Sequence, residues 1–575
     1  MTDYDILIKG GTVLDGSGQP GFVGDVALKG DRIVAVGNCP GTAAREIDAR
    51  GKLVTPGFVD IHTHYDGQSI WSEEMSPSSS HGVTTVVMGN CGVGFAPCRK
   101  EDQQVLIKVM EGVEDIPGVV MAEGLPWDWE TFPEYLDAVD SRRRDIDVAA
   151  LLPHSPLRVY AMGERGANRE PANDEDLAKM RGLAREALEA GAIGFATSRL
   201  QIHKTMDGDF IPSFEADSKE LVEIASAMKD VGSGVMQMVP NIYNGWEVEF
   251  AHLKAIVDAT GRPATFTYAT ANSGPPTWLE ALELVEAENA KGAKFRPQII
   301  PRPIGMVAGF ELSTHPFCLC PSYLPIAKLP LAEQLEHLKD PAFRAQLIAE
   351  QPEEGHPLAQ LSRNWNWLFP LSDPPNYEPP RESSIAAQAE AQGRSPEEVA
   401  MDLLMNGGDG LGMLYNALGN FHDGKLDALL PLMQHKDVVL GLGDGGAHYA
   451  AICDASYSTF LLTYWTRDRA GEKIDWPAAI KALTFTPADT MCLSDRGLLK
   501  PCYKADVNVI DADRLALHRP EVKFDLPTGG RRLDQAATGY DWTICSGEVI
   551  RQSDKSTGAR PGRLVRGSQN APLAA

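Results

Sequence analysis

The pattern of apolar and polar positions divides the chain into two β-rich ends and a middle of different character. Short stretches near both ends alternate apolar and polar residues and are interrupted by Gly-Gly, Asp-Gly and Gly-Asp pairs, which are typical of hairpins. These stretches are residues 4–16, 24–37, 45–57, 504–513 and 540–552. The pattern predicts one small β-sandwich domain, formed jointly by residues 1–55 and 497–575.

The middle of the chain alternates short apolar runs with helical patterns. Amphipathic helices are expected over residues 174–191 and 218–232, each closed by a glycine. Eight apolar runs have the length of buried strands: 53–64, 83–91, 148–154, 192–198, 234–240, 264–270, 295–301 and 437–446. Buried strands separated by crossover segments are typical of a closed (β/α)8 TIM-like barrel, which we expect over residues 56–496.

One connection in this barrel is unusually long. The connection between the seventh and eighth runs covers about residues 303–437. It includes "NWNWLFPLSDPPNYEPP", which is rich in Trp, Pro and Tyr. A connection of this length is usually a functional lid or an inserted subdomain.

Composition and charge narrow the class of partner. The chain of 575 residues is 43% hydrophobic and 23% charged, as in ordinary globular proteins, and its formal net charge is −26. This charge argues against nucleic acid or an anionic membrane surface as partner, because both attract basic patches. No apolar run reaches membrane-spanning length, and acids near the start argue against a signal peptide. Nine cysteines, an odd number, favour reduced thiols. We therefore expect a cytoplasmic protein with a small-molecule substrate.

Metal-binding residue types stand where the predicted strands end. The first run ends in His62 and His64, which point to the same side of a strand because they are two residues apart. The second run ends in Cys91, and the eighth carries Asp444. Since the carboxyl ends of barrel strands meet on one face, these side chains could hold a zinc ion, which accepts N, S and O ligands. Asp444 could also accept and return a proton as general base and acid.

Other side chains near the strand ends could contact the substrate or support the metal ligands. The candidates for these roles are His154, Arg158, Gln237, Tyr268 and His448. Tyr268 could donate a hydrogen bond to an oxyanion, and His448 could polarise the substrate or contact Asp444. Three more residues just past strand ends could hold a substrate carboxylate, or could be ordinary surface residues: Arg199, His203 and Arg302.

Several longer motifs resemble the N-acyl-D-amino-acid deacylases (D-aminoacylases) of the amidohydrolase superfamily. They are "TPGFVDIHTH", "GVTTVVMGNCGVGFAP", "EGLPWDWETFPEYLDAV", "PHSPLRVYAMG", "EALEAGAIGFATS" and "GLGDGGAH". The His-x-His pair is shared across the superfamily, whereas "GNCGVGFAP" and "EGLPWDWETFPEYL" are specific to this branch. The resemblance runs almost end to end and implies the same barrel with a small β domain from both termini.

The resemblance also implies roles for individual residues. Cys91 would take the metal-bridging role that a carbamylated lysine has in other branches. The family has a histidine at the end of strand 5 and another at the end of strand 6, where this chain has Gln237 and Tyr268. An amide is a weak zinc ligand, and a phenol must lose a proton near pH 10. We therefore expect one zinc per chain, held by His62, His64, Cys91 and Asp444, although other divalent metals are open.

The sequence leaves three functions open. The first is metal-dependent hydrolysis of the amide bond of an N-acyl amino acid or related small amide. The second keeps the fold and metal but acts on an ester, a lactone or another bond of a xenobiotic or aromatic metabolite. The third is a non-catalytic binding module without metal. Members of this barrel family often form homo-oligomers, but nothing in the sequence marks an interface.

Overall fold

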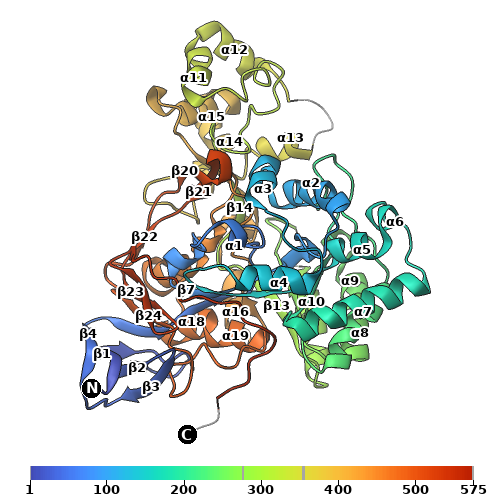
Figure 1. Ribbon diagram of the computed structural model, residues 1–575. Coiled ribbons are helices and arrows are strands. Elements are labelled where there is room, and N and C mark those ends of the chain that lie inside the picture. The colour runs from blue at the N-terminus through green and yellow to red at the C-terminus, as the bar shows by residue number, and fades with distance from the viewer. Residues whose placement is uncertain (1, 275–276, 353–356, 573–575) are drawn as a thin grey trace.

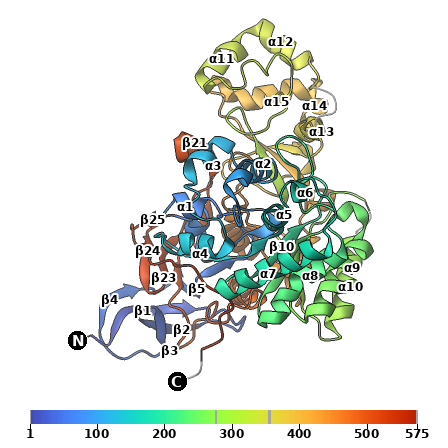
Figure 2. The ribbon, with the colours of Figure 1, turned by 45° about the vertical axis from the view of Figure 1, so that its right-hand side comes forward.

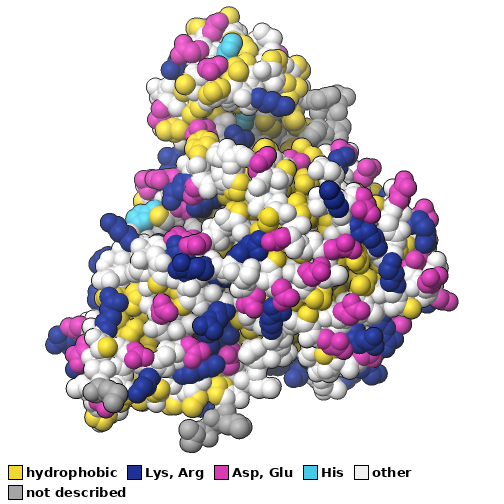
Figure 3. Space-filling model, in the orientation of Figure 1, with side chains coloured by type: hydrophobic (Ala, Val, Ile, Leu, Met, Phe, Trp, Pro, Cys, Tyr) yellow, Lys and Arg dark blue, Asp and Glu magenta, His cyan; other side chains and the backbone are white. Residues whose placement is uncertain are grey.

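The computed structural model describes residues 2–274, 277–352 and 357–572 of a mixed α/β protein. Figure 1 shows the strands of the chain ends at one side of the body and a helical lobe at its top. Acidic and basic side chains are interspersed over the face seen in Figure 3, so the net negative charge does not form one patch there. Among the described residues, we find no helix with the length and apolar character needed to cross a membrane.

Strands from both ends of the chain share one sheet. Within the described ranges its strands are β1 (Tyr4–Val13), β2 (Phe22–Lys29), β3 (Arg32–Gly37), β4 (Ala43–Asp48), β5 (Leu53–Pro56), β18 (Val507–Ile510), β23 (Tyr540–Cys545), β24 (Glu548–Gln552) and β25 (Lys555–Ser556). The two ends meet where β5 pairs antiparallel with β18, with Val54 opposite Val509. We predicted a β-sandwich from these strands. In the structure they form one sheet, which branches at β1 because β1 pairs with both β4 and β5.

Each of the eight predicted apolar runs contains a strand of one of two parallel sheets. These strands are β6 (Phe58–Asp60), β7 (Val83–Met88), β8 (Asp147–Ala150), β9 (Leu152–Pro153), β10 (Gly194–Ser198), β11 (Val235–Val239), β12 (Ala264–Thr267), β13 (Phe295–Ile299) and β17 (Val439–Leu440). They pair in the orders β6-β7-β8 and β9-β10-β11-β12-β13-β17, and β8 and β9 are successive parts of one run. The first run divides at Gly57, so that β5 belongs to the sheet of the chain ends and β6 to the parallel strands.

Backbone hydrogen bonds join the segment after β17 to the segment after β6. The amide of Asp444 donates to the His62 carbonyl (3.0 Å), and the amide of His64 donates to the Gly445 carbonyl (2.8 Å). At Gly446 the backbone φ is +88°, and a Cβ there would lie 2.7 Å from the His64 carbonyl oxygen. Glycine is therefore required for this close approach, which brings the last predicted strand end beside the first.

Helices form a layer outside the parallel strands, as Figures 1 and 2 show for α7, α8 and α9. The two helices predicted from the sequence are α7 (Asp174–Ala190) and α8 (Ser218–Val231), which begin after the capping residues Asn173 and Asp217. Other helices of this part are α1 (Gln68–Trp71), α2 (Gln103–Glu114), α3 (Gly118–Gly124), α4 (Phe132–Asp140), α5 (His154–Met162), α6 (Glu164–Ala167), α9 (Trp246–Thr260), α10 (Trp278–Asn289), α17 (Tyr457–Phe460), α18 (Trp476–Leu483) and α19 (Phe485–Thr490).

The long connection before β17 carries elements of its own. Its antiparallel strands are β14 (Ile304–Ala308), β15 (Leu368–Pro370) and β16 (Leu414–Gly419). Its helices are α11 (Leu331–Lys339), α12 (Pro341–Ala349), α13 (Pro357–Ser362), α14 (Ile385–Gln392), α15 (Pro396–Met405) and α16 (Leu429–Gln434). A separate apolar core that includes Phe317, Leu338 and Met401 holds the lobe together. In Figures 1 and 2, α11, α12 and α15 project from the body.

Candidate active site

The four predicted metal ligands lie together at the ends of three strands. Among the described residues, only one group of three or more His, Cys, Asp or Glu residues has ligand atoms that all lie within 4.8 Å of one another. It consists of His62, His64 and Cys91. Sγ of Cys91 is 3.4 Å from Nε2 of His62 and 3.7 Å from Nε2 of His64. Oδ1 of Asp444 is 3.5 Å and 3.7 Å from the same two nitrogens. Two imidazoles, a thiol and a carboxylate therefore face one small space.

The backbone at two of these residues adopts the left-handed conformation. Cys91 has φ 57° in the turn after β7, and Asp444 has φ 47° in the turn after β17. This conformation is uncommon for residues other than glycine and often occurs at functional sites. At Cys91 it is supported by Gln237, whose Oε1 accepts a hydrogen bond (3.1 Å) from the Cys91 amide. The side chain of Gln237 thus contacts the backbone of a candidate ligand.

Two buried side chains orient the histidine rings from behind. Oε1 of Gln298, on β13, lies 2.8 Å from Nδ1 of His62. Oε1 of Glu114, at the end of α2, lies 3.4 Å from Nδ1 of His64. In both rings Nδ1 is directed to an oxygen and Nε2 toward Cys91, the arrangement seen around metal-binding histidines. Our sequence reasoning missed both residues.

Glu114 also links the site to His448. Its other oxygen, Oε2, is 3.5 Å from Nε2 of His448, and its backbone carbonyl accepts from the His448 amide. The side chains of Asp444 and His448 are 22% and 33% exposed, whereas those of His62 and His64 are only 2% and 1% exposed. The site therefore opens to solvent on the side of Asp444 and His448.

The charge around the site is acidic. Burial raises the pKa of Asp444 to about 7, and burial together with nearby carboxylates raises the pKa of Cys91 well above its usual value. The charges that shift the pKa values of His64, Cys91 and Glu114 belong only to imidazoles and carboxylates. Grouped buried acids and a thiol are what a divalent cation stabilises, so the residues present fit a zinc ion.

His203 belongs to the same neighbourhood. It lies in the segment after β10, and its Nδ1 is 2.8 Å from Oγ of Ser198. Burial, together with the imidazoles of His448 and His62, lowers the pKa of His203 to about 3. The structure therefore brings a further imidazole close to the site.

His154 and Arg158 are held in a separate buried network. The two ring nitrogens of His154 are 2.8 Å from Oγ1 of Thr197 and 2.9 Å from Oε1 of Glu220. Arg158 makes an ion pair (3.3 Å) with the same Glu220 carboxylate. Within the part of the chain that the structure describes, neither makes a hydrogen bond or ion pair with the four candidate ligands. Their role in contacting the substrate or supporting the ligands stays a prediction.

The structure corrects the position expected for Tyr268. Its ring packs against Trp246, and its hydroxyl donates to the carbonyl of Trp278, so the hydroxyl is already used within the helical layer. Thr267, one residue earlier, is in register with Gln298 on the neighbouring strand. Neighbours in register lie on the same face of a sheet, so Thr267 has the position that we assigned to Tyr268.

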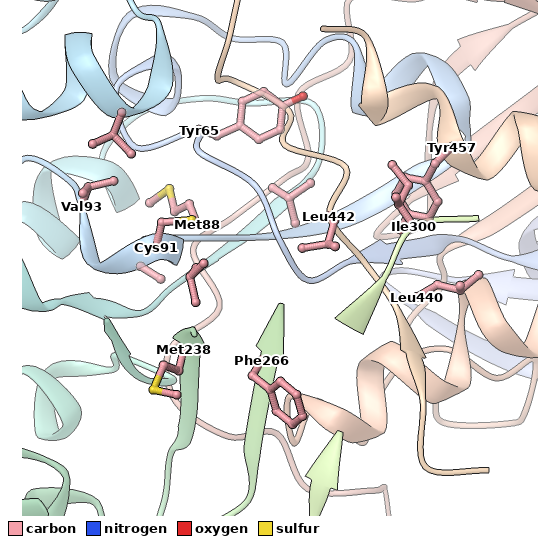
Figure 4. Close-up of a cluster of buried hydrophobic side chains, with 14 of the residues drawn as sticks. Tyr65, Met88, Cys91, Val93, Met238, Phe266, Ile300, Leu440, Leu442 and Tyr457 are labelled. Carbon is pink, nitrogen blue, oxygen red and sulfur yellow. The ribbon is translucent and has the colours of Figure 1, made fainter. Parts of the chain in front are cut away.

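The apolar surroundings of Cys91 appear in Figure 4. The labelled side chains Met88, Val93, Met238 and Leu442 lie around it, contributed by different strands and by the segments that follow them. An apolar shell limits the access of water and lowers the local dielectric constant.

Comparisons with known proteins identify the family of the chain. Residues 45–551 match the Amidohydrolase family. The chain is 34% identical over 230 residues to the D-aminoacylase of Alcaligenes xylosoxydans xylosoxydans, an alignment that spans 40% of this chain and 43% of that protein. It is 26% identical over 570 residues to the N-acyl-D-glutamate deacylase of the same organism, covering 98% and 96% of the two chains.

A solved structure shows the same fold. The N-acyl-D-glutamate deacylase of Bordetella bronchiseptica, complexed with zinc and a phosphonate inhibitor that mimics the tetrahedral intermediate, superimposes with a TM-score of 0.65 at 21% identity. The match covers 98% of this chain and 99% of that one. The expected resemblance to the D-aminoacylases is confirmed. The chain belongs to the amidohydrolase family.

Proposed function

We propose that this protein hydrolyses the amide bond of an N-acyl amino acid or a related small amide, using one zinc ion held by His62, His64, Cys91 and Asp444. The family makes it a hydrolase acting on carbon–nitrogen bonds other than peptide bonds. The observation that carries the proposal is the buried group of two imidazoles and a thiol, with the Asp444 carboxylate 3.5 Å and 3.7 Å from the two imidazoles. Relatives that act on N-acyl-D-glutamate favour an acylated amine as the substrate class.

The chain's own residues supply proton transfer and orientation. When bound, zinc would supply Lewis-acid chemistry, activating water and polarising the scissile carbonyl. Asp444 would accept the proton of the attacking water on its carboxylate and pass it to the departing nitrogen. Gln298 and Glu114 would keep the His62 and His64 rings fixed, so that little reorganisation is needed during the reaction.

His448 has the position of a substrate contact. It lies at the open side of the site, and Glu114 holds its Nε2 at 3.5 Å. The remaining ring nitrogen, Nδ1, would then meet a substrate group that enters past Asp444. Among the described residues, His448 makes no ion pair with a candidate ligand. The role of His448 would therefore be to bind and orient the substrate.

A single zinc is proposed because the other half of a two-metal site lacks good ligands. Gln237 uses its side-chain oxygen to accept from the Cys91 amide, and Tyr268 uses its hydroxyl at Trp278. Thr267 offers a neutral hydroxyl, which is a poor ligand for zinc compared with an imidazole.

A substrate panel on zinc-loaded protein tests the proposal. It contains N-acyl amino acids of both chiralities, simple N-acyl amines, and the matching esters and lactones. We expect amide hydrolysis that Asp444→Asn lowers by about 10²–10⁴-fold, the usual contribution of proton transfer. Zinc content of the variant, measured in parallel, separates loss of the base from loss of the metal. Turnover of esters alone would favour the alternative, and an unchanged rate in Asp444→Asn would exclude the proposed role of this carboxylate.

A further inference from the structure

We infer that the substrate is uncharged next to the scissile bond: the site is built for a neutral acyl amine and not for an N-acyl amino acid with a free α-carboxylate. This inference rests on the proposed function and narrows its substrate class. It follows from the side chains that surround the candidate ligands and from those that are missing there.

In the described part of the chain, no lysine or arginine side chain pairs with the residues of the candidate site. Across residues 2–274, 277–352 and 357–572, none makes an ion pair or hydrogen bond with the candidate ligands, with Glu114 or with His448. The residues outside these ranges include no lysine or arginine at all. A substrate carboxylate is normally bound by such a cation, most often by a bidentate arginine.

Arg199 and Arg302, which we predicted as possible ligands of a substrate carboxylate, pair with other residues. Nε of Arg199 pairs at 2.9 Å with the buried carboxylate of Glu249. Arg302 is fully buried, lies 3.4 Å from Asp454 and stacks on the ring of Tyr377 at 3.7 Å. Each guanidinium would have to abandon a buried partner to reach a substrate, which leaves an unpaired buried charge behind.

Nearby lysines are also committed. The ammonium of Lys204, next to His203 in the segment after β10, lies 4.9 Å from the centre of the Phe210 ring. Lys108 on α2 pairs with Asp207 at 2.7 Å. Both cations therefore already have a partner in the segment after β10.

Acidic side chains, and not cations, surround the candidate ligands. The carboxyl groups of Asp60 and Asp66 are buried beside the histidine turn, where they accept backbone hydrogen bonds from His62 and Gly89. With Glu114 they give three buried acids near the half-buried Asp444, around one candidate metal site. None of these groups carries a positive charge, so none of them would pair with a substrate carboxylate.

The segments after β10 and β11 offer apolar surface instead. Ile202 and Met206 are 63% and 61% exposed, and Ile242 and Tyr243 are 46% and 61% exposed. Both segments follow strands whose ends surround the site, and the first of them carries His203. Apolar side chains at strand ends suit an apolar substituent on the amine or the acyl group.

Matched compounds test the inference. One member of each pair is an N-acyl amino acid, and the other is the N-acyl amino alcohol in which hydroxymethyl replaces the carboxylate; both chiralities are used. Dissociation constants and kcat/KM are measured with zinc-loaded protein. We expect the neutral member to bind more tightly and to have a kcat/KM at least about tenfold higher. The reason is that the carboxylate of the other member would lose its hydration without gaining a cationic partner in the site.

The two readouts keep the inference separate from the proposed function. Tighter binding of the carboxylate, or no measurable binding of the neutral member, would overturn the inference whether or not either compound is hydrolysed. Tighter binding of the neutral member without hydrolysis of either would support the inference while removing amide hydrolysis as the function.

A variant that adds a cation gives an independent test. His203→Arg places a guanidinium in the segment nearest the ligand cluster, and His203→Gln is the uncharged control. We expect the arginine variant to shift the kcat/KM ratio toward the carboxylate by about tenfold, and the glutamine variant to keep the wild-type ratio. Circular dichroism establishes that both are folded. A preference for the carboxylate that is equal in wild type and both variants would contradict the inference.

Discussion

Oε1 of Glu114 lies 3.4 Å from Nδ1 of His64, on the side of the ring opposite the nitrogen that faces Cys91 and Asp444. The same carboxylate lies 3.5 Å from His448. One residue at the end of α2 therefore lies against both a candidate ligand and a candidate substrate contact.

Glu114→Gln should weaken zinc binding. Loss of a carboxylate behind a ligand histidine typically reduces metal affinity by about 10–100-fold, because the ring is less firmly oriented and less basic. The dissociation constant of zinc is measured by competition with a chelator. Glu111→Gln is the matched control, since Glu111 is on the same helix and its Oε1 accepts from the Gly118 amide, which glutamine can also do. Equal affinities of the two variants would mean that Glu114 does not support the site.

Elemental analysis of metal-replete protein should find about one zinc per chain, and His62→Ala should lose it. The reason is that the described residues bring together one set of ligand atoms. About two zinc ions per chain would mean that Gln237 or Thr267 contributes to a second site. None in well-folded protein would favour the non-catalytic hypothesis.

Tyr268→Phe should lower stability and leave the activity nearly unchanged. The substitution removes the hydroxyl that donates to the half-buried carbonyl of Trp278, which costs about 0.5–1.5 kcal/mol of unfolding free energy. Urea unfolding measures this loss. Tyr160→Phe, whose hydroxyl bonds an exposed carboxylate of Glu130, is the control and should cost less. A large fall in kcat at unchanged stability would restore Tyr268 to the catalytic site.

The stability of the protein should depend on pH through Asp115. Burial raises the pKa of this carboxyl to about 6, compared with an ordinary value of 3.8, and its Oδ2 accepts from Ser313 at 2.6 Å. Because the folded state holds the proton more tightly, the resulting stabilisation is fully present below about pH 4 and is lost as the pH rises through 6.

The variant Asp115→Asn keeps the hydrogen-bond acceptor and removes the titration. The two proteins should be similarly stable near pH 4, and wild type should lose about 1–2 kcal/mol relative to the variant by pH 7. Unfolding free energies at several pH values measure this difference. A difference that is independent of pH, or that favours wild type at high pH, would contradict the expected shift.

The sequence indicated the parallel strands and the four candidate ligands because both depend on local pattern. Strand ends of a barrel share a face, so the residues after each apolar run could be brought together without knowing any contact. Tyr268 was misplaced because a shift of one residue reverses the face of a strand, and an apolar run does not fix that register. The aromatic ring instead belongs with Trp246.

Neither Gln298 nor Glu114 follows a strand end: Gln298 lies within β13, one residue before it ends, and Glu114 ends α2. Each nevertheless had a local signal. Gln298 is a buried polar residue within an apolar strand, and such a residue needs a partner. Glu114 follows Ile107 and Met110 at helical spacing, so it lies on the buried face of α2. The identity of their partners depends on how distant segments pack, which one sequence does not reveal.

The pairing of β5 with β18 has a consequence for synthesis on the ribosome. At about 5–20 residues per second, the roughly 450 residues between these strands take on the order of 20–90 seconds to translate. During that interval the N-terminal strands have left the ribosome, but β18, the strand that pairs with β5, has not yet been synthesised. An unpaired strand edge can associate with another chain, so nascent chains on one messenger RNA are exposed to mispairing until the final segment appears.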